Sequence, residues 1–242
     1  MLLAASAQAL SITVDGYLSD WGLNTSSFGE NDNNWDPGLP GVYVFQEDWV
    51  GSGDYVGPGY GAQNYDVEAI LVTVVGQNLY VAIATGFPQW GIKDWDAGDI
   101  AFDVGSDGKW DYALVISNYV DGDNSRETVL GGFYQVSSWA DVAYEEHAVS
   151  NPFRMEEGSL IGTTDFVYQR DPDHEEFPRY FIEAAIPLAW LGYPGKITVN
   201  WTMECGNDYG KVEATIPEPA SILLLGSGLF VVGAFLRKKF KA

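Results

Sequence analysis

The chain has 242 residues, with 12 Lys and Arg against 34 Asp and Glu and a formal net charge of −22. This surplus of acids excludes nucleic acid as a partner, because neutralising phosphates requires a basic surface. Aromatic residues make up 14% and hydrophobic residues 46% of the chain, enough to build a core, so disorder does not explain the charge. The single cysteine, Cys205, cannot form an intramolecular disulfide.

The first nine residues, 1–9, resemble the end of a secretory signal peptide. They are mostly apolar and finish in Ala7-Gln8-Ala9, the small-x-small pattern that precedes signal cleavage. Nine residues are too few for a whole signal peptide, and no basic residue precedes the apolar stretch. We therefore interpret 1–9 as a signal peptide remnant. The alternative is a mature N-terminal tail that is rich in alanine.

Residues 10–216 predict one all-β domain. Two β-branched runs, 66–75 and 78–85, are separated by Gly76-Gln77, which indicates a hairpin. Loops rich in Gly, Asp and Asn separate the further predicted strands: 100–104, 110–117, 128–137, 143–149, 179–186 and 196–203. This spacing is typical of a single two-sheet antiparallel β-sandwich of jelly-roll type, rather than of alternating strands and helices.

Three stretches of this domain carry a family resemblance. Residues 12–22 contain Asp-Gly followed by Asp-Trp, and 98–103 and 181–188 come later in the same order. Together they resemble DOMON-like sandwiches related to the ninth family of carbohydrate-binding modules. The resemblance implies a β-sandwich that binds sugars or redox cofactors, in some members with calcium. It covers framework stretches only, so it assigns no sugar-binding residue.

The stretch from Asp103 to Asp111 is the sequence's best candidate for a calcium site. Asp103, Asp107 and Asp111 are four residues apart, and the glycines between them allow a tight bend. Calcium takes about six to eight oxygen ligands, and such a bend can bring several carboxylates to one centre. Asp99 lies near enough in sequence to complete the shell. The alternative is an ordinary turn with solvated aspartates.

Tryptophans in polar loops provide a second functional hypothesis. Residues 29–61 form a long polar insertion that carries Trp35 and Trp49, and a later loop carries Trp90 and Trp95. A connection as long as 29–61 is more often a functional loop than a passive link. Exposed aromatic rings stack on the apolar faces of sugars, so these four residues are candidate glycan contacts. The alternative for each of them is ordinary packing.

The sequence gives little support for catalysis. Paired carboxylates can hydrolyse glycosides, but acids are so frequent here that any one pair carries almost no information. We find no serine nucleophile motif, and the only histidines are His147 and His174. Some DOMON domains bind haem through His and Met, but two unconnected histidines are the preferred interpretation. We therefore expect a protein that is not an enzyme.

The C-terminal segment, 217–242, has three parts. They are the triplet Pro217, Glu218 and Pro219, the apolar run 220–236, and the basic tail 237–241 with Arg237, Lys238, Lys239 and Lys241. As a helix the apolar run would be about 25 Å long, enough to cross a thin bilayer with the basic tail in the cytoplasm. This order resembles the bacterial PEP-CTERM sorting signal, which implies processing by an exosortase-type membrane protease. The alternative is an ordinary C-terminal membrane anchor.

These features together predict an exported bacterial protein of the cell surface or the extracellular polysaccharide matrix. Before processing, a C-terminal transmembrane helix would anchor it in the membrane. We expect its ectodomain to bind glycan through loop aromatics, with calcium holding the acidic loops. One alternative is a structural matrix protein that assembles through calcium. A glycan hydrolase is the other.

Overall fold

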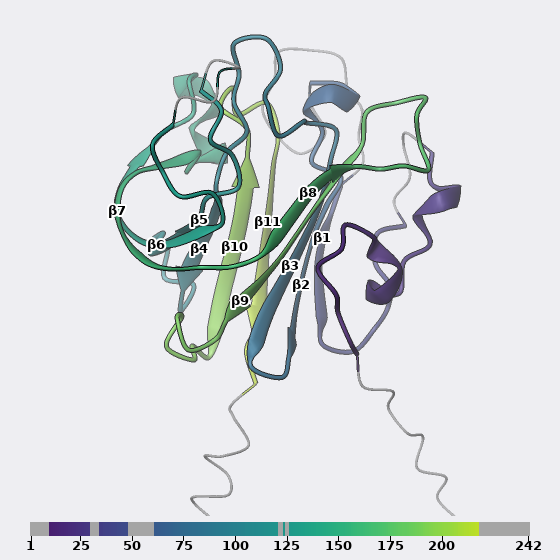
Figure 1. Ribbon diagram of the computed structural model, residues 1–242, viewed down its shortest axis with the longest axis horizontal. Helices are drawn as coiled ribbons and strands as arrows, with labels where there is room; N and C mark the ends of the chain where they lie inside the picture. The colour runs from purple at the N-terminus through teal and green to yellow at the C-terminus, as the bar shows by residue number, and fades with distance from the viewer. Residues whose placement is uncertain (1–9, 30–33, 48–60, 121–122, 124–125, 218–242) are drawn as a thin grey trace, which may run out of the picture.

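The computed structural model describes residues 10–29, 34–47, 61–120, 123 and 126–217, and these residues form two antiparallel sheets that face each other (Figure 1). The first sheet has the order β1-β2-β3-β9-β8, formed by β1 (Val42–Gln46), β2 (Ala69–Val75), β3 (Asn78–Thr85), β8 (Phe166–Arg170) and β9 (Tyr180–Pro187). The second has the order β11-β10-β4-β5-β6-β7. Its strands are β4 (Ile100–Val104), β5 (Tyr112–Leu114), β6 (Gly132–Ala140), β7 (Arg154–Thr163), β10 (Lys196–Thr202) and β11 (Tyr209–Thr215).

The prediction of an all-β chain with two antiparallel sheets is confirmed. The hairpin at Gly76 forms as expected: Val75 pairs with Asn78, and Gly76 has a φ of 63°, a conformation that glycine adopts without strain. The strand predicted at 100–104 matches β4. Those predicted at 179–186 and 196–203 correspond to β9 and β10 within one residue at each end.

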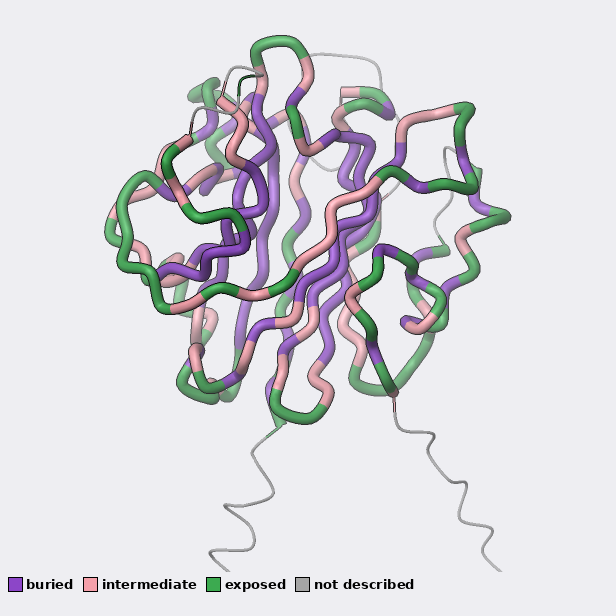
Figure 2. The backbone as a smooth tube through the Cα atoms, viewed as in Figure 1, coloured by how far each residue is buried: buried purple, intermediate pink, exposed green. Residues whose placement is uncertain are grey.

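The main core lies between the sheets. Each central strand sends alternate side chains inward, among them Ile70, Ile83 and Ile182 from the first sheet and Phe102 and Val199 from the second. Burying one such side chain contributes about 1.5–3 kcal/mol, so this layer is the main source of stability. Figure 2 shows the buried residues concentrated along these central strands, with the exposed ones in the connections.

Residues 10–28 pack against the outer face of the first sheet. Here η1 (Leu18–Trp21) carries Leu18 and Trp21, which join Leu71 and Phe181 in a second buried cluster, and η2 (Thr25–Ser27) follows it with no buried residue. This segment contains the Asp-Gly and Asp-Trp pairs that carried the family resemblance. Its structural role is therefore to cover one face of the sandwich.

A buried carboxylate attaches this segment to the sheet. Glu183 of β9 accepts N–H groups from Asp15 at 3.2 Å and Gly16 at 2.5 Å, and the Trp21 indole N–H at 2.7 Å. Burial raises the pKa of Glu183 to about 7, the hydrogen bonds from Trp21, Gly16 and Asp15 oppose that rise, and the charge of Asp20 adds to it. Folding therefore leaves a carboxyl group that titrates near neutrality beneath the N-terminal segment.

Several predicted boundaries were wrong. The strand expected at 143–149 is instead η4 (Glu145–Ser150), a 3-10 helix in which only His147 and Ser150 are buried. Its first turn begins with two glutamates, which suit a helix start better than a strand. Part of the expected loop 29–61 is strand β1, and β7, β8 and β11 were not predicted.

The two ends of the chain were predicted to carry export signals. The signal remnant 1–9 and the segment 218–242 lie outside the described residues. Pro217, the last described residue, is exposed. Within the part that the structure describes, no helix is long and apolar enough to cross a membrane.

Candidate functional site

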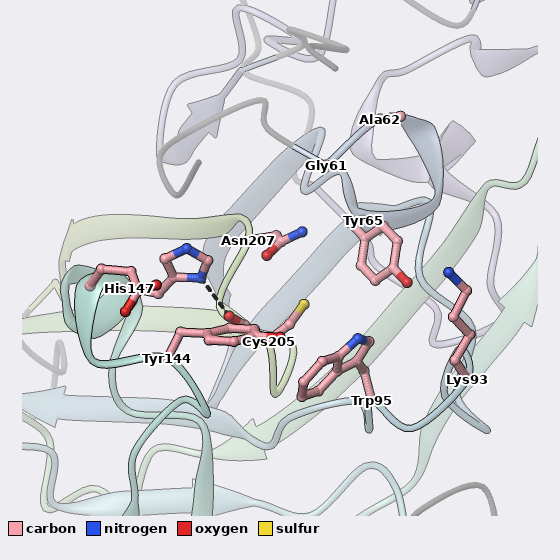
Figure 3. Close-up of a pocket in the computed structure, with 10 residues that line it drawn as sticks. Gly61, Ala62, Tyr65, Lys93, Trp95, Tyr144, His147, Cys205 and Asn207 are labelled. Carbon is pink, nitrogen blue, oxygen red and sulfur yellow. Dashed lines mark hydrogen bonds between the residues drawn. The ribbon is translucent and has the colours of Figure 1, made fainter. Parts of the chain in front are cut away.

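A cleft of about 640 Å³ opens where four connections meet at one end of the sandwich (Figure 3). The connections are η3 (Gln63–Tyr65), the β3–β4 loop, η4 and the β10–β11 turn. The residues that line the cleft are Gly61, Ala62, Tyr65, Lys93, Trp95, Tyr144, Glu146, His147, Cys205 and Asn207. Aromatic rings and polar groups thus face one open space, which is the usual composition of a small-ligand site.

The cleft lies at the end of the domain opposite the exit of the C-terminal segment. In the β10–β11 hairpin, the pair Thr202 and Tyr209 borders the turn that reaches the cleft, whereas Lys196 and Thr215 pair at the far end. Figure 1 shows the chain leaving β11 at that far end, away from the loops around η3 and η4. Ligand access and chain exit therefore do not compete for space.

Two aromatic rings form one side of the cleft. Trp95 and Tyr144 have ring centroids 5.4 Å apart and an interplanar angle of 54°. Tyr144 is 40% exposed, so much of its ring is available to a ligand. Tyr65 contributes a third ring, and burial, with a smaller effect of Cys205, raises its pKa. The Tyr65 hydroxyl therefore keeps its proton at neutral pH and can donate a hydrogen bond.

The turn that carries Trp95 is held firmly in place. Ile92 and Trp95 exchange backbone hydrogen bonds of 2.9 and 3.1 Å. The next residue, Asp96, donates its N–H to the Glu204 carboxylate at 3.0 Å and pairs with Arg154 at 3.3 Å. Trp95 is thus fixed to the neighbouring β10–β11 turn, so its position would need little further ordering to contact a ligand.

The cleft contains a thiol, that of Cys205, that is not activated as a nucleophile. Burial is the main cause that raises the pKa of the Cys205 thiol to about 12, so it is neutral at physiological pH. His147 places Nδ1 2.7 Å from the Cys205 carbonyl oxygen, and this contact fixes η4 to the β10–β11 turn. His174 binds a different partner, Asp171, at 2.8 Å. The two histidines therefore belong to separate structural contacts.

The predicted calcium residues of the β4–β5 turn use their oxygens for backbone hydrogen bonds. Asp103 accepts the N–H groups of Asp107 at 3.0 Å and Gly108 at 2.8 Å. Asp111 accepts the N–H of Val104 at 2.9 Å. These hydrogen bonds suit the ordinary turn that the sequence left open as the alternative, and calcium at Asp103, Asp107 and Asp111 stays a prediction.

Asp99, the fourth predicted calcium ligand, lies elsewhere. Its carboxylate is completely buried and forms a bidentate ion pair with Arg126, with both N–O distances at 2.7 Å. One of its oxygens also accepts the N–H of Met155 at 3.0 Å. The prediction that Asp99 completes a shell with the β4–β5 turn is corrected here, because Arg126 neutralises this carboxylate.

A different group of acids has the geometry of a cation site. Glu47, Asp66 and Asp208 each place a carboxylate oxygen within 4.8 Å of the others, and Asp66 and Asp208 are buried. Hard oxygen ligands of this kind suit calcium. Asp208 also accepts the N–H groups of Val67 at 2.6 Å and Tyr209 at 2.8 Å, so a cation there would share its oxygens with the backbone. Asp66 follows Tyr65 and Asp208 follows Asn207, so the acids adjoin two residues that line the cleft. The spacing of these residues in the sequence does not predict the group, because its members come from three distant segments.

The four predicted tryptophans have different environments. Trp95 lines the cleft, and Trp90 is 53% exposed but packs edge-on against Tyr180 outside the cleft lining. Trp35 is completely buried against Phe28 and under the Arg179 guanidinium, so glycan contact by Trp35 is corrected to core packing. Trp49 lies outside the described residues.

The described residues form an all-β domain with an aromatic-lined cleft, and a short segment follows this domain. Residues 215–239 match the family model of the PEP-CTERM protein-sorting motif. The chain thus carries this sorting signal, which marks it as an exported protein sorted to the cell surface by an exosortase. No curated protein and no solved structure matches the chain.

Proposed function

We propose that the domain is a non-enzymatic cell-surface module that binds an extracellular polysaccharide in the cleft between Tyr65, Trp95 and Tyr144. The observation that supports it is the joint presentation of three aromatic side chains and the polar side chains of Glu146 and Asn207. Aromatic rings bind the apolar faces of sugars, and carboxylate and amide groups bind their hydroxyls. A DOMON-like relationship to carbohydrate-binding modules is part of this proposal.

The composition of the cleft favours binding over hydrolysis. Canonical glycoside hydrolysis uses two carboxyl groups that flank the scissile bond. Among the lining residues that the structure describes, Glu146 is the only carboxylate. The Cys205 thiol is neutral at physiological pH, so it does not supply a nucleophile.

Calcium enters the proposal as a stabiliser of the cleft. Glu47, Asp66 and Asp208 bring three like charges together, and a divalent cation there would offset their repulsion. Because Asp66 adjoins Tyr65 and Asp208 adjoins Asn207, such a cation would fix two sides of the cleft. Calcium would then raise both the stability of the domain and its affinity for glycan.

The first test measures glycan binding by the full chain, purified in a polyoxyethylene detergent that carries no sugar headgroup. A panel of extracellular polysaccharides identifies a ligand, and calorimetry then compares Trp95→Ala with Trp90→Ala. We expect Trp95→Ala to weaken binding about tenfold or more, and Trp90→Ala to leave it unchanged. Absence of saturable binding, or equal losses in both variants, would refute the proposal.

The second test measures thermal unfolding with calcium and with a chelator. A ligand at about 100 times its Kd stabilises a protein by about 2.7 kcal/mol, which raises Tm by about 5–10 °C for a domain of this size. Asp66→Asn should abolish the calcium-dependent shift, and Asp107→Asn should keep it. A shift that survives in Asp66→Asn places calcium elsewhere. Calcium-dependent self-association without glycan binding would instead favour a structural matrix protein.

A further inference from the structure

Lys93 is set apart from most other basic side chains of the domain. Five of them pair with carboxylates of the same chain, namely Lys109, Arg126, Arg154, Arg179 and Lys196. Among the described residues, Lys93 has no such ion pair. Within the described part of the chain, Arg170 and Lys211 have no ion pair either, but Arg170 donates to the Glu175 carbonyl oxygen at 3.0 Å, and the Lys211 ammonium lies 5.2 Å from the centroid of the Trp110 ring. The charge of Lys93 is therefore available to a group from outside.

Lys93 stands at the cleft in an unfavourable backbone conformation. Its φ is +57°, in the left-handed region that non-glycine residues rarely adopt. The hydrogen bonds between Ile92 and Trp95 hold it there. Figure 3 shows Lys93 beside Trp95 and Tyr65, at the end of the cleft opposite His147. Backbone outliers that the surrounding structure imposes cluster at ligand sites, so this one supports a role for Lys93 in binding.

We propose that the cleft selects a glycan whose sugar residues carry carboxylates, that is, a uronic-acid polysaccharide. This inference rests on the proposed function and names its ligand class. The rings of Trp95 and Tyr144 stack on the sugar, and the Lys93 ammonium pairs with the sugar carboxylate. A neutral glycan would leave Lys93 without a role at this position.

The other charged residue of the cleft orients the ligand. Glu146 precedes His147, which lies at the end opposite Lys93 (Figure 3). A carboxylate placed near Glu146 would be repelled, whereas one near Lys93 would be attracted. The bound uronate therefore lies at the Lys93 end, and the hydroxyls of a neighbouring sugar lie near Glu146 and Asn207.

The acidic chain as a whole repels an anionic polymer at long range. This repulsion is screened beyond about 8 Å at physiological ionic strength, whereas the contact with Lys93 is shorter than that distance. Binding is therefore best measured at about 0.15 M salt, where the ion pair between Lys93 and the sugar carboxylate outweighs the repulsion from the net negative charge of the chain.

The experiment compares matched probes on the full chain in the same detergent. The probes are hexamers of galacturonate and of mannuronate, the methyl esters of both, and neutral cellohexaose and maltohexaose. The esters keep the shape of the sugars and remove their charge. The variants are Lys93→Met, which removes the charge, Lys93→Arg, which retains it, and the control Lys109→Met, an exposed lysine in the β4–β5 turn.

We expect wild type to bind at least one uronate hexamer about fivefold more tightly than its methyl ester. Lys93→Met should lose this preference, and Lys93→Arg and Lys109→Met should keep it. The inference is overturned if acid and ester bind equally, or if Lys93→Met retains the preference. Binding of neutral probes that depends on Trp95 would then still support the proposed function. If no hexamer and no polysaccharide of the panel binds, both this inference and the proposed function are refuted.

Discussion

Replacing Glu183 by glutamine should change how the stability of the domain depends on pH. Glu183 is 1% exposed and holds the N-terminal segment through Asp15, Gly16 and Trp21. Its pKa is raised to about 7 in the folded state, from an ordinary value of 4.5. Glutamine has a similar shape but does not ionise, so it resembles the protonated form of Glu183.

The sign of the effect follows from proton binding. Between pH 4.5 and about 7 the folded state holds a proton on Glu183 that the unfolded chain has released. The free energy of unfolding of wild type therefore falls as pH rises through this window. A shift of one pKa unit corresponds to about 1.4 kcal/mol, so the whole window amounts to about 3 kcal/mol. Above about pH 7, wild type has lost the whole of this contribution to its free energy of unfolding.

Urea unfolding, followed by tryptophan fluorescence from about pH 5 to pH 8, measures this effect. Other carboxyl groups titrate in wild type and variant alike, so the informative quantity is the difference between the two free energies of unfolding. As the pH rises from about 5 to 8, we expect the free energy of unfolding of Glu183→Gln to increase by about 2.5 kcal/mol relative to that of wild type. Glu157→Gln, at an exposed position on β7, serves as the control and should show no such gain.

A constant difference between wild type and Glu183→Gln would refute this reasoning. It would mean that Glu183 titrates at the same pH in the folded and unfolded chain. In that case the hydrogen bonds from Trp21 and the backbone would fully offset the cost of burial, and the N-terminal segment would be insensitive to pH near neutrality.

Three further predictions follow from buried or terminal groups. Arg179→Met leaves the Glu68 carboxylate buried without its partner. Urea unfolding should therefore show a free energy of unfolding about 3–5 kcal/mol lower than that of wild type, and a loss below about 1 kcal/mol would contradict this. Cys205 should react slowly with iodoacetamide at about pH 8 in the folded protein and rapidly in concentrated urea, and equal rates would show that the thiol is accessible. Glu218→Gln, within the sorting motif, should leave an unprocessed chain in the membrane fraction of a host that expresses an exosortase. Normal processing of this variant would argue against a role for Glu218.

The strands that sequence reasoning located best are buried in the middle of the sheets. β4 has four buried residues of five, and β10 has six of seven, so their composition is dominated by the core. β7 was missed for the opposite reason. It is an edge strand with mostly exposed residues, including Glu156, Glu157 and Gly158, and it shows no alternation of apolar and polar positions. Edge strands depend on a neighbour for their conformation, and that neighbour is not visible locally.

The candidate site was predictable only in part. Trp95 stood out because it lies in a polar loop, but Tyr65, Tyr144 and Asn207 drew no attention by spacing or motif. They reach the cleft only because η3, η4 and the β10–β11 turn meet at one end of the two sheets. The expected metal residues around Asp103 formed a recognisable local pattern, yet local patterns of Asp and Gly also suit an ordinary turn.

The position of Pro217 has a consequence for how the protein works on a crowded surface. The seven residues of β11 separate the cleft end from the exit of the sorting segment, a span of about 23 Å. Wherever the exported protein is held through its C-terminus, the domain itself acts as a spacer, and the cleft points away from the attachment point. Under the proposed function, a long, stiff polymer would then be bound without having to approach the cell envelope, and removal of the tail would leave the shape of the cleft unchanged.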